Sequence, residues 1–162
     1  ALASLTHMPI VDLGTGRRVG RVDDIILSAD YRSVEAYASH SGFLRGTQAF
    51  PARGATLGPD AITLPPGTLD RFDKRSLRGL PLAGGLAGTR LLSDGGRVLG
   101  TVKDLRMDPR TAEVVGYEVT PEDRGLLDRL RHHTVLLPVA EVRQRGTDAW
   151  IVAEDDARQH FG

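Results

Sequence analysis

The chain has 162 residues, enough for one ordinary domain or two small ones. Its 21 basic and 21 acidic residues cancel, which disfavours a dedicated nucleic-acid-binding protein. Cysteine is absent, so disulfides, thiolate metal sites and cysteine nucleophiles are excluded. The apolar runs are far shorter than the roughly 20 residues that a membrane-spanning helix needs.

The sequence repeats itself after 80 residues. Seven of the 28 positions from 10 to 37 are identical to the residue 80 places later, whereas about two are expected by chance at average composition. The identical pairs are Gly16/Gly96, Arg17/Arg97, Gly20/Gly100, Val22/Val102, Asp24/Asp104, Val34/Val114 and Tyr37/Tyr117. We therefore expect a first domain at residues 1–66, a linker at 67–85 and a second domain at 86–162.

The first long strand of each unit is predicted at residues 19–27 and 98–107. Apolar residues alternate along both segments, which is typical of a half-buried strand, but their phase changes once in the middle. One extra residue at Asp24 or Asp104 would restore the inward phase, as a β-bulge does. The carboxylate at this position would then accept hydrogen bonds from backbone N–H groups that the bulge leaves unpaired.

Helical structure is expected in only two places. The linker, rich in Pro, Gly and charge, carries one predicted helical turn at residues 69–76. In the second unit, residues 121–132 predict a helix, because Thr120 can cap it and Pro121 suits the first helical position. The acidic residues 154–156 are predicted to be a solvated end.

The order of these motifs resembles the PRC-barrel domain. Residues 16–25 and 96–105 both follow the pattern Gly-x-x-Val/Leu-Gly-x-Val-x-Asp-hydrophobic, and a hydrophobic-Pro-small step and an Asp-Ala-hydrophobic strand follow twice. The family includes the cytoplasmic part of the photosynthetic reaction-centre H subunit and the C-terminal domain of the ribosome maturation factor RimM. The resemblance implies an all-β protein of two tandem small PRC-type β-barrels, with one short helix in the second. It also implies a docking or scaffolding role without catalysis.

The predicted function is that of a non-enzymatic, cytoplasmic adaptor or scaffold that docks a partner protein. The predicted partner-binding residues are Phe43, Leu44, Leu126 and Leu127, because loops on a rigid barrel tend to carry function; the alternative is that these side chains cover the end of a barrel. No catalytic residue, metal ligand or cofactor site is predicted, because the sequence shows neither a nucleophile held by a base nor metal-ligand spacing.

Two other functions stay open. An RNA- or ribosome-associated assembly factor is the first alternative, although the zero net charge makes nucleic acid a disfavoured partner. A hydrolytic or metal-dependent enzyme is the second. The sequence predicts no transmembrane segment, and it leaves open peripheral membrane association and a homo-oligomer.

Overall fold

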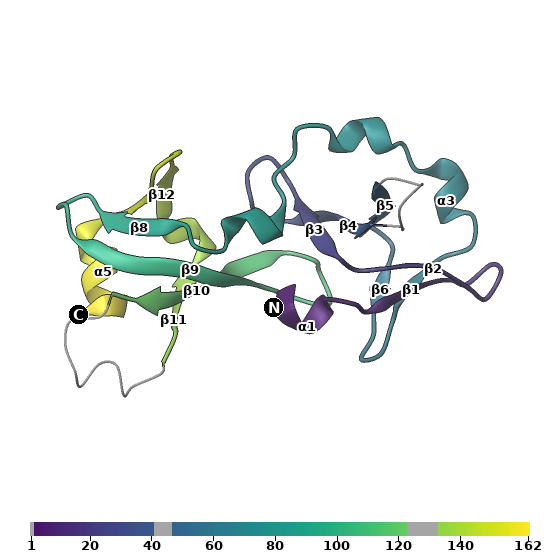
Figure 1. Ribbon diagram of the computed structural model, residues 1–162, viewed down its shortest axis with the longest axis horizontal. Coiled ribbons are helices and arrows are strands. Elements are labelled where there is room, and N and C mark those ends of the chain that lie inside the picture. The colour runs from purple at the N-terminus through teal and green to yellow at the C-terminus, as the bar shows by residue number, and fades with distance from the viewer. Residues whose placement is uncertain (1, 41–46, 123–132) are drawn as a thin grey trace. The chain divides into compact units, whose positions relative to one another are not determined.

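A computed structural model describes residues 2–40, 47–122 and 133–162, and it is mostly β (Figure 1). Its residues group into two compact units. Unit 1 comprises Ala1–Gly85 with Met107–Val114, and unit 2 comprises Leu86–Arg106 with Val115–Gly162. The segment 67–85, expected as a linker, is therefore part of unit 1.

Unit 1 holds two sheets. Its strands are β1 (Pro9–Asp12), β2 (Arg17–Arg21), β3 (Asp24–Leu27), β4 (Val34–His40), β5 (Thr47–Pro51), β6 (Thr56–Leu57) and β7 (Ile62–Leu64). One sheet has the order β2-β1-β7-β6, in which β1 and β7 run parallel, and the other is the antiparallel sheet β3-β4-β5. The short helical segments are α1 (Leu2–Leu5), α3 (Thr68–Arg71), η1 (Lys74–Leu77) and η2 (Ala83–Leu86), the last of which ends at the first residue of unit 2.

Unit 2 holds one six-stranded sheet that curls into a half-barrel. Its elements are β8 (Arg90–Ser93), β9 (Val98–Met107), β10 (Val114–Pro121), β11 (Val135–Pro138), η3 (Val139–Glu141), β12 (Val142–Arg145), β13 (Trp150–Val152) and α5 (Glu154–Phe161). The strand order is β11-β10-β9-β8-β13-β12. The chain leaves unit 2 near the end of β9 and re-enters it at the start of β10, so the intervening residues 107–114 belong to unit 1.

The two units repeat the same strand order, which confirms that the predicted long strands are equivalent. In unit 2, the single strand β9 lies between β8 and β10. In unit 1 two shorter strands take its place: β2 pairs with β1, and β3 pairs with β4. The ungapped offset of 80 is wrong for the first strand, because Ile10 pairs with Gly20 as Leu91 pairs with Gly100. The turn before β2 is closed by the Gly16 N–H on the Asp12 carbonyl, four residues back, and the turn before β9 by the Gly96 N–H on the Ser93 carbonyl, three residues back, so one extra residue moves the offset of β1 to 81.

The phase change along the first long strand of unit 1 is confirmed, and the strand is also divided there. Val22 and Ile25 are both 0 % exposed. Between them the strand is interrupted, since β2 pairs with β1 and β3 pairs with β4 in a separate sheet. The Asp23 backbone N–H donates to the Ala38 carbonyl at 2.8 Å and Asp24 is also paired with Ala38, so two residues face one here, as the predicted bulge requires; a further register shift lies between Ile26 and Leu27.

The predicted role of the repeated aspartates is confirmed. The Asp24 carboxylate accepts hydrogen bonds from the backbone N–H of Ile25 at 2.8 Å and of Gly84 at 2.9 Å. The Asp104 carboxylate accepts from the backbone N–H of Leu105 at 2.7 Å. Both carboxylates therefore accept hydrogen bonds from backbone N–H groups at the point where the inward-facing side of the strand changes.

The segment after β7 covers one face of the β3-β4-β5 sheet. Phe72, Leu77 and Leu80 pack against a buried cluster on that face, made of Ile26, Ala36 and Ala38. Figure 1 shows this segment, with α3, passing along the sheet. Apolar contact on this second face explains why a stretch with the composition of a linker belongs to unit 1.

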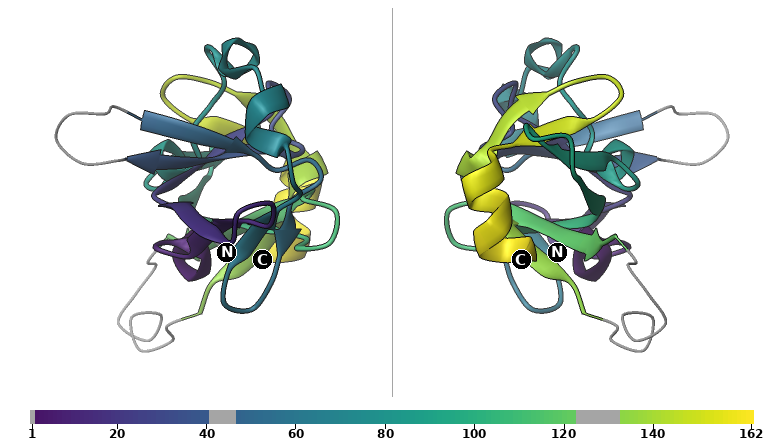
Figure 2. Two further views of the ribbon diagram at one scale, coloured as in Figure 1. Left: turned by 90° about the vertical axis from the view of Figure 1, so that its right-hand side faces the viewer. Right: turned by 90° about the vertical axis from the view of Figure 1, so that its left-hand side faces the viewer.

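Unit 2 has a helix that was not predicted, and most of the predicted helix at residues 121–132 lies outside the described residues. Pro121 is the last residue of β10, so no helix begins there, and residues 123–132 lie outside the described part of the chain. The predicted solvated end is instead the first turn of α5, which buries Ala157 completely and lies beside β11 (Figure 2). No helix in the described ranges is long and apolar enough to cross a membrane.

Candidate binding pocket

The four residues predicted to bind a partner, Phe43, Leu44, Leu126 and Leu127, all lie outside the described residues. Their role stays a prediction. Elsewhere, the structure described for residues 2–40, 47–122 and 133–162 brings together no group of three or more His, Asp or Glu side chains that could hold a metal. Other features of the described residues must therefore indicate where a ligand could bind.

Unit 1 contains a pocket of about 430 Å³. It lies between the end of the β4-β5 pair and the segment that follows β7. Its lining residues are Glu35, Pro51, Arg53, Gly54, Pro65, Pro66, Thr68, Arg71, Phe72, Ser76 and Leu77. The volume is within the usual range for ligand sites, and the lining mixes apolar side chains with a few polar ones, as such sites do.

A tight turn positions Arg71 at the pocket. The Thr68 backbone N–H donates to the Pro65 carbonyl at 3.2 Å, and Gly67, with φ 79° and ψ 0°, takes the left-handed position of a type II turn. Pro66 occupies the position before it, where its fixed φ suits this turn. An added Cβ on Gly67 would lie 3.4 Å from Nη2 of Arg71, so the guanidinium lies across the turn.

A second turn positions Arg53 next to β4. The Ala52 backbone N–H donates to the Glu35 carbonyl at 3.0 Å, and the Ala55 N–H donates to the Ala52 carbonyl at 3.1 Å. Gly54 has φ 83°, which closes this turn at little steric cost. Arg53 therefore projects from a hydrogen-bonded turn, on the side of the pocket that also carries Glu35.

The apolar wall of the pocket is fixed to the sheet. Phe72 and Leu77 line the pocket and also pack against the buried cluster of β3 and β4. Between them, the Asp73 carboxylate accepts from the Arg75 backbone N–H at 2.9 Å and begins η1. This wall is therefore held by side-chain packing and a helix cap together.

The two arginines of the pocket have no acidic partner among the residues that the structure describes. The one carboxylate in the lining, Glu35, accepts a hydrogen bond of 3.5 Å from the Ser33 hydroxyl. Other arginines are engaged with acids, as in Arg21–Asp23 at 3.1 Å and Arg97–Glu154 at 3.4 Å. Two arginines thus line the pocket without an acidic partner in the described chain, and a guanidinium can form bidentate hydrogen bonds with a carboxylate.

Unit 2 closes the equivalent place with its own chain. Leu13 N–H donates to the carbonyl of Leu64 at 2.9 Å, and at the equivalent position Asp94 N–H donates to the carbonyl of Val152 at 2.9 Å. The chain therefore leaves the last strand in the same way in both units. The two acceptor residues, Leu64 and Val152, are 88 positions apart in the sequence. Beyond this point unit 2 continues as the eight-residue α5, whereas unit 1 makes a turn and then forms the four-residue α3, followed by η1.

The contact that closes unit 2 involves the counterparts of two pocket residues. Counted along the chain, His160 stands at the offset of 88 from Phe72, and Glu141 stands at the offset of 87 from Gly54 that relates β5 to β11. In unit 2 the His160 Nε2 and Glu141 Oε2 atoms are 2.7 Å apart. In unit 1, Phe72 and Gly54 line an open pocket instead.

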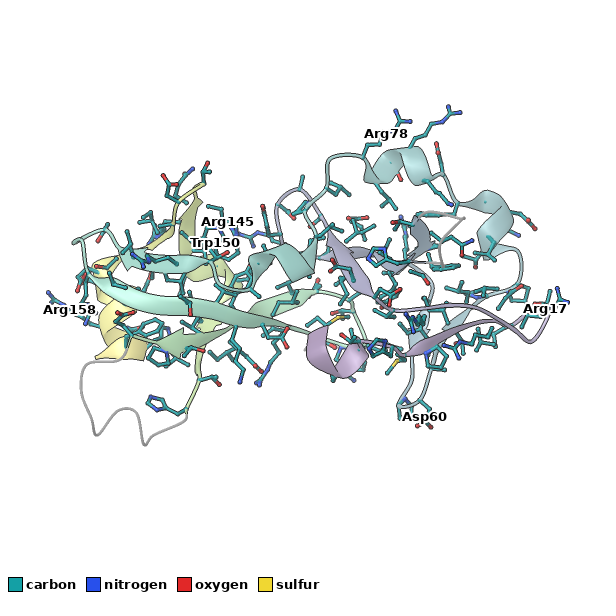
Figure 3. All side chains as sticks on the ribbon, viewed as in Figure 1. Arg17, Asp60, Arg78, Arg145, Trp150 and Arg158 are labelled. Carbon is teal, nitrogen blue, oxygen red and sulfur yellow. The ribbon has the colours of Figure 1, made fainter. Side chains whose placement is uncertain are left out.

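Two other polar sites are occupied by the chain's own groups. In unit 2 the Arg145 guanidinium lies 5.7 Å from the Tyr117 ring centre and 5.1 Å from that of Trp150, and it donates to the Tyr117 hydroxyl at 2.9 Å (Figure 3). In unit 1 a smaller pocket of about 360 Å³ is lined by Arg18 and Arg21 among others, but Asp23 engages Arg21. Both clusters are therefore less available to a ligand than Arg53 and Arg71.

Sequence reasoning did not identify this pocket. Its residues come from β4, from the end of β5 and the turn after it, and from the segment after β7, and among them only Pro51 belongs to a repeated motif, the hydrophobic-Pro-small step. Composition predicts a linker at residues 67–85, the segment that carries Arg71. No protein-family model matches the chain, and no curated protein matches it.

Proposed function

We propose that the protein is a non-enzymatic adaptor of two PRC-barrel-type modules, and that it docks a partner protein in the pocket of unit 1. The repeated strand order supports the tandem arrangement, and the curled sheet of unit 2 supports its kinship with small barrels. The loop residues Phe43, Leu44, Leu126 and Leu127 remain further candidates for contact with the partner.

One observation carries the proposal. Unit 2 fills the space beside its η3 with the helix α5, through the contact of His160 with Glu141. In unit 1 the segment that follows the last strand instead borders an open pocket of about 430 Å³, bounded by hydrogen-bonded turns and by an apolar wall that packs against the sheet. A groove that one copy of a fold fills with its own helix suits a segment of another protein, as in helix-in-groove recognition.

Site-specific photo-crosslinking in the source cell tests the proposal. We place p-benzoylphenylalanine at Ser76, which is exposed and lines the pocket, and as a matched control at Thr147, which is exposed in the β12–β13 turn of unit 2. After irradiation we expect a discrete protein adduct from position 76 that is absent from position 147.

Each other outcome rejects part of the proposal. If position 76 gives no adduct in cells that contain the protein at its native level, or if both positions give the same adducts, the pocket is not a docking site. If the adduct from position 76 disappears on ribonuclease treatment, the RNA-associated alternative replaces the adaptor. If a purified wild-type sample converts a substrate and one His or Asp substitution abolishes the conversion, the non-enzymatic assignment is wrong.

A further inference from the structure

The charge of the pocket indicates what kind of segment it takes. Arg53 and Arg71 contribute two positive charges to the lining, and Glu35 contributes one negative charge. The remaining lining residues are uncharged, and Phe72, Leu77 and Pro51 provide apolar surface. An occupant that carries carboxylates next to an apolar side chain would match both features.

The arrangement of Arg71 favours a carboxylate ligand over water. Its guanidinium is placed across Gly67 by the type II turn, which limits the side-chain freedom that ligand binding must restrict. A planar guanidinium presents a fixed fork of donors that fits a carboxylate in a bidentate manner. The apolar wall beside it excludes water from one side, and this strengthens a charge-assisted hydrogen bond.

Unit 2 provides an example of the same chemistry. Its helix α5 begins with three consecutive acidic residues, Glu154–Asp156, and follows them with the fully buried Ala157. Two of these acids meet arginines of unit 2, Arg97 with Glu154 at 3.4 Å and Arg143 with Asp156 at 3.9 Å. In unit 1 the arginines are present at the pocket, but no acidic helix of the described chain reaches them.

We infer that the pocket of unit 1 binds an acidic peptide segment of the partner, in which Asp or Glu residues flank an aliphatic or aromatic side chain. Arg53 and Arg71 bind the carboxylates, and Phe72 and Leu77 receive the apolar side chain. This inference rests on the proposed docking function, and it adds the chemistry of the partner segment.

Peptide selection on the full chain tests the inference. The probe is a displayed library of random 12-residue peptides, and a fluorescent synthetic copy of an enriched peptide is then titrated by anisotropy. We expect the enriched peptides to share acidic residues beside a Leu, Ile or Phe. Binding should weaken as salt is raised, because the exposed part of the contact is ionic.

Two matched double variants separate the pocket from general charge effects. Arg53→Glu with Arg71→Glu should weaken binding of the acidic peptide about tenfold or more. Arg17→Glu with Arg110→Glu changes the net charge equally at exposed positions outside the pocket, with Arg17 at the tip of the β1–β2 hairpin (Figure 3), and should leave binding nearly unchanged. The pocket variant should in turn prefer a peptide in which Lys replaces the acids. Circular dichroism of all variants must match wild type.

The outcomes distinguish the inference from the proposed function. If the enriched peptides lack acids and bind the Arg53→Glu, Arg71→Glu variant as well as wild type, yet lose affinity in Ser76→Trp, docking is right and the acidic partner is wrong. If both double variants weaken binding equally, the effect is general charge and the inference is wrong. If no peptide is enriched and position 76 gives no crosslink, both proposals are wrong.

Discussion

Equivalent strand faces in the two units carry opposite chemistry. In unit 1, Ile26 and Ala38 are 8 % and 1 % exposed, because the segment after β7 covers them. At the equivalent positions of unit 2, Arg106 and Glu118 form an ion pair of 3.0 Å, and the Arg106 side chain is 52 % exposed. The residues on this face are therefore apolar where another part of the chain covers the strands, and charged where they are exposed.

Exchanging the outward residue between the units tests this comparison most strongly. Ala38→Glu places a carboxylate under the covering segment, and an unpaired buried charge should lower the free energy of unfolding by about 3–5 kcal/mol. The reciprocal change Glu118→Ala removes only a surface ion pair, which is worth at most about 1 kcal/mol. Urea unfolding of both variants measures the difference. Equal small losses would mean that the covering segment does not bury Ala38 in solution.

The repeated mid-strand glycines provide a smaller contrast. Gly100 has φ 151°, and an added Cβ would lie 2.1 Å from the Thr120 carbonyl oxygen, so Gly100→Ala should cost about 2–4 kcal/mol through strain and overpacking. At Gly20 the nearest atom to the added Cβ is Cε2 of Phe50 at 2.9 Å. A side-chain atom can shift more readily than a backbone carbonyl, so Gly20→Ala should cost less, about 1 kcal/mol. Thermal unfolding ranks the two variants, and a larger loss at Gly20 would contradict the comparison.

The repeated tyrosines give the smallest effect, which depends on pH. Burial raises the pKa of the Tyr37 hydroxyl above its usual value near 10. The folded state therefore holds this proton where the unfolded chain has lost it, so the stabilisation is complete below pH 10 and is lost as pH rises through the raised pKa. Tyr37→Phe should leave stability at pH 7 within about 1 kcal/mol of wild type and should reduce its fall between pH 9 and 11. Urea unfolding across that range measures both slopes, and equal slopes would show that Tyr37 ionises equally in both states.

Much of the strand pairing could be predicted from the sequence because both copies had to satisfy the same pairing. The residues that the repeat aligns at Tyr37 and Tyr117 occupy matching positions, opposite Phe50 and Leu137. The offset of the first strand was missed because one inserted turn residue leaves little trace in an ungapped comparison. Glu154 and its neighbours were assigned to the solvent because acidic residues at a chain end give no local sign of what covers them.

The pocket could not be predicted, because it depends on where one segment packs. Composition places residues 67–85 among linkers, and only the outward-facing residues of unit 1 indicate otherwise. Ile26 stands where unit 2 has Arg106, and Ala38 stands where unit 2 has Glu118. Comparing the outward positions of the two copies would have predicted a covered face, and Phe72, Leu77 and Leu80 are the apolar residues of that segment that cover it.

The path of the chain also sets the order in which unit 1 can be completed during synthesis. Residues Met107–Val114 belong to unit 1, where Val34 N–H donates to the Ala112 carbonyl and Val114 N–H donates to the Arg32 carbonyl, both at 2.8 Å. These partners are made about 80 residues after the strand that they join. Although domains usually fold as units from the N-terminus, unit 1 cannot complete its hydrogen bonding before residue 114 has left the ribosome. By then Leu86–Arg106 of unit 2 have already been made, so the last residues of unit 1 are synthesised between the two segments of unit 2.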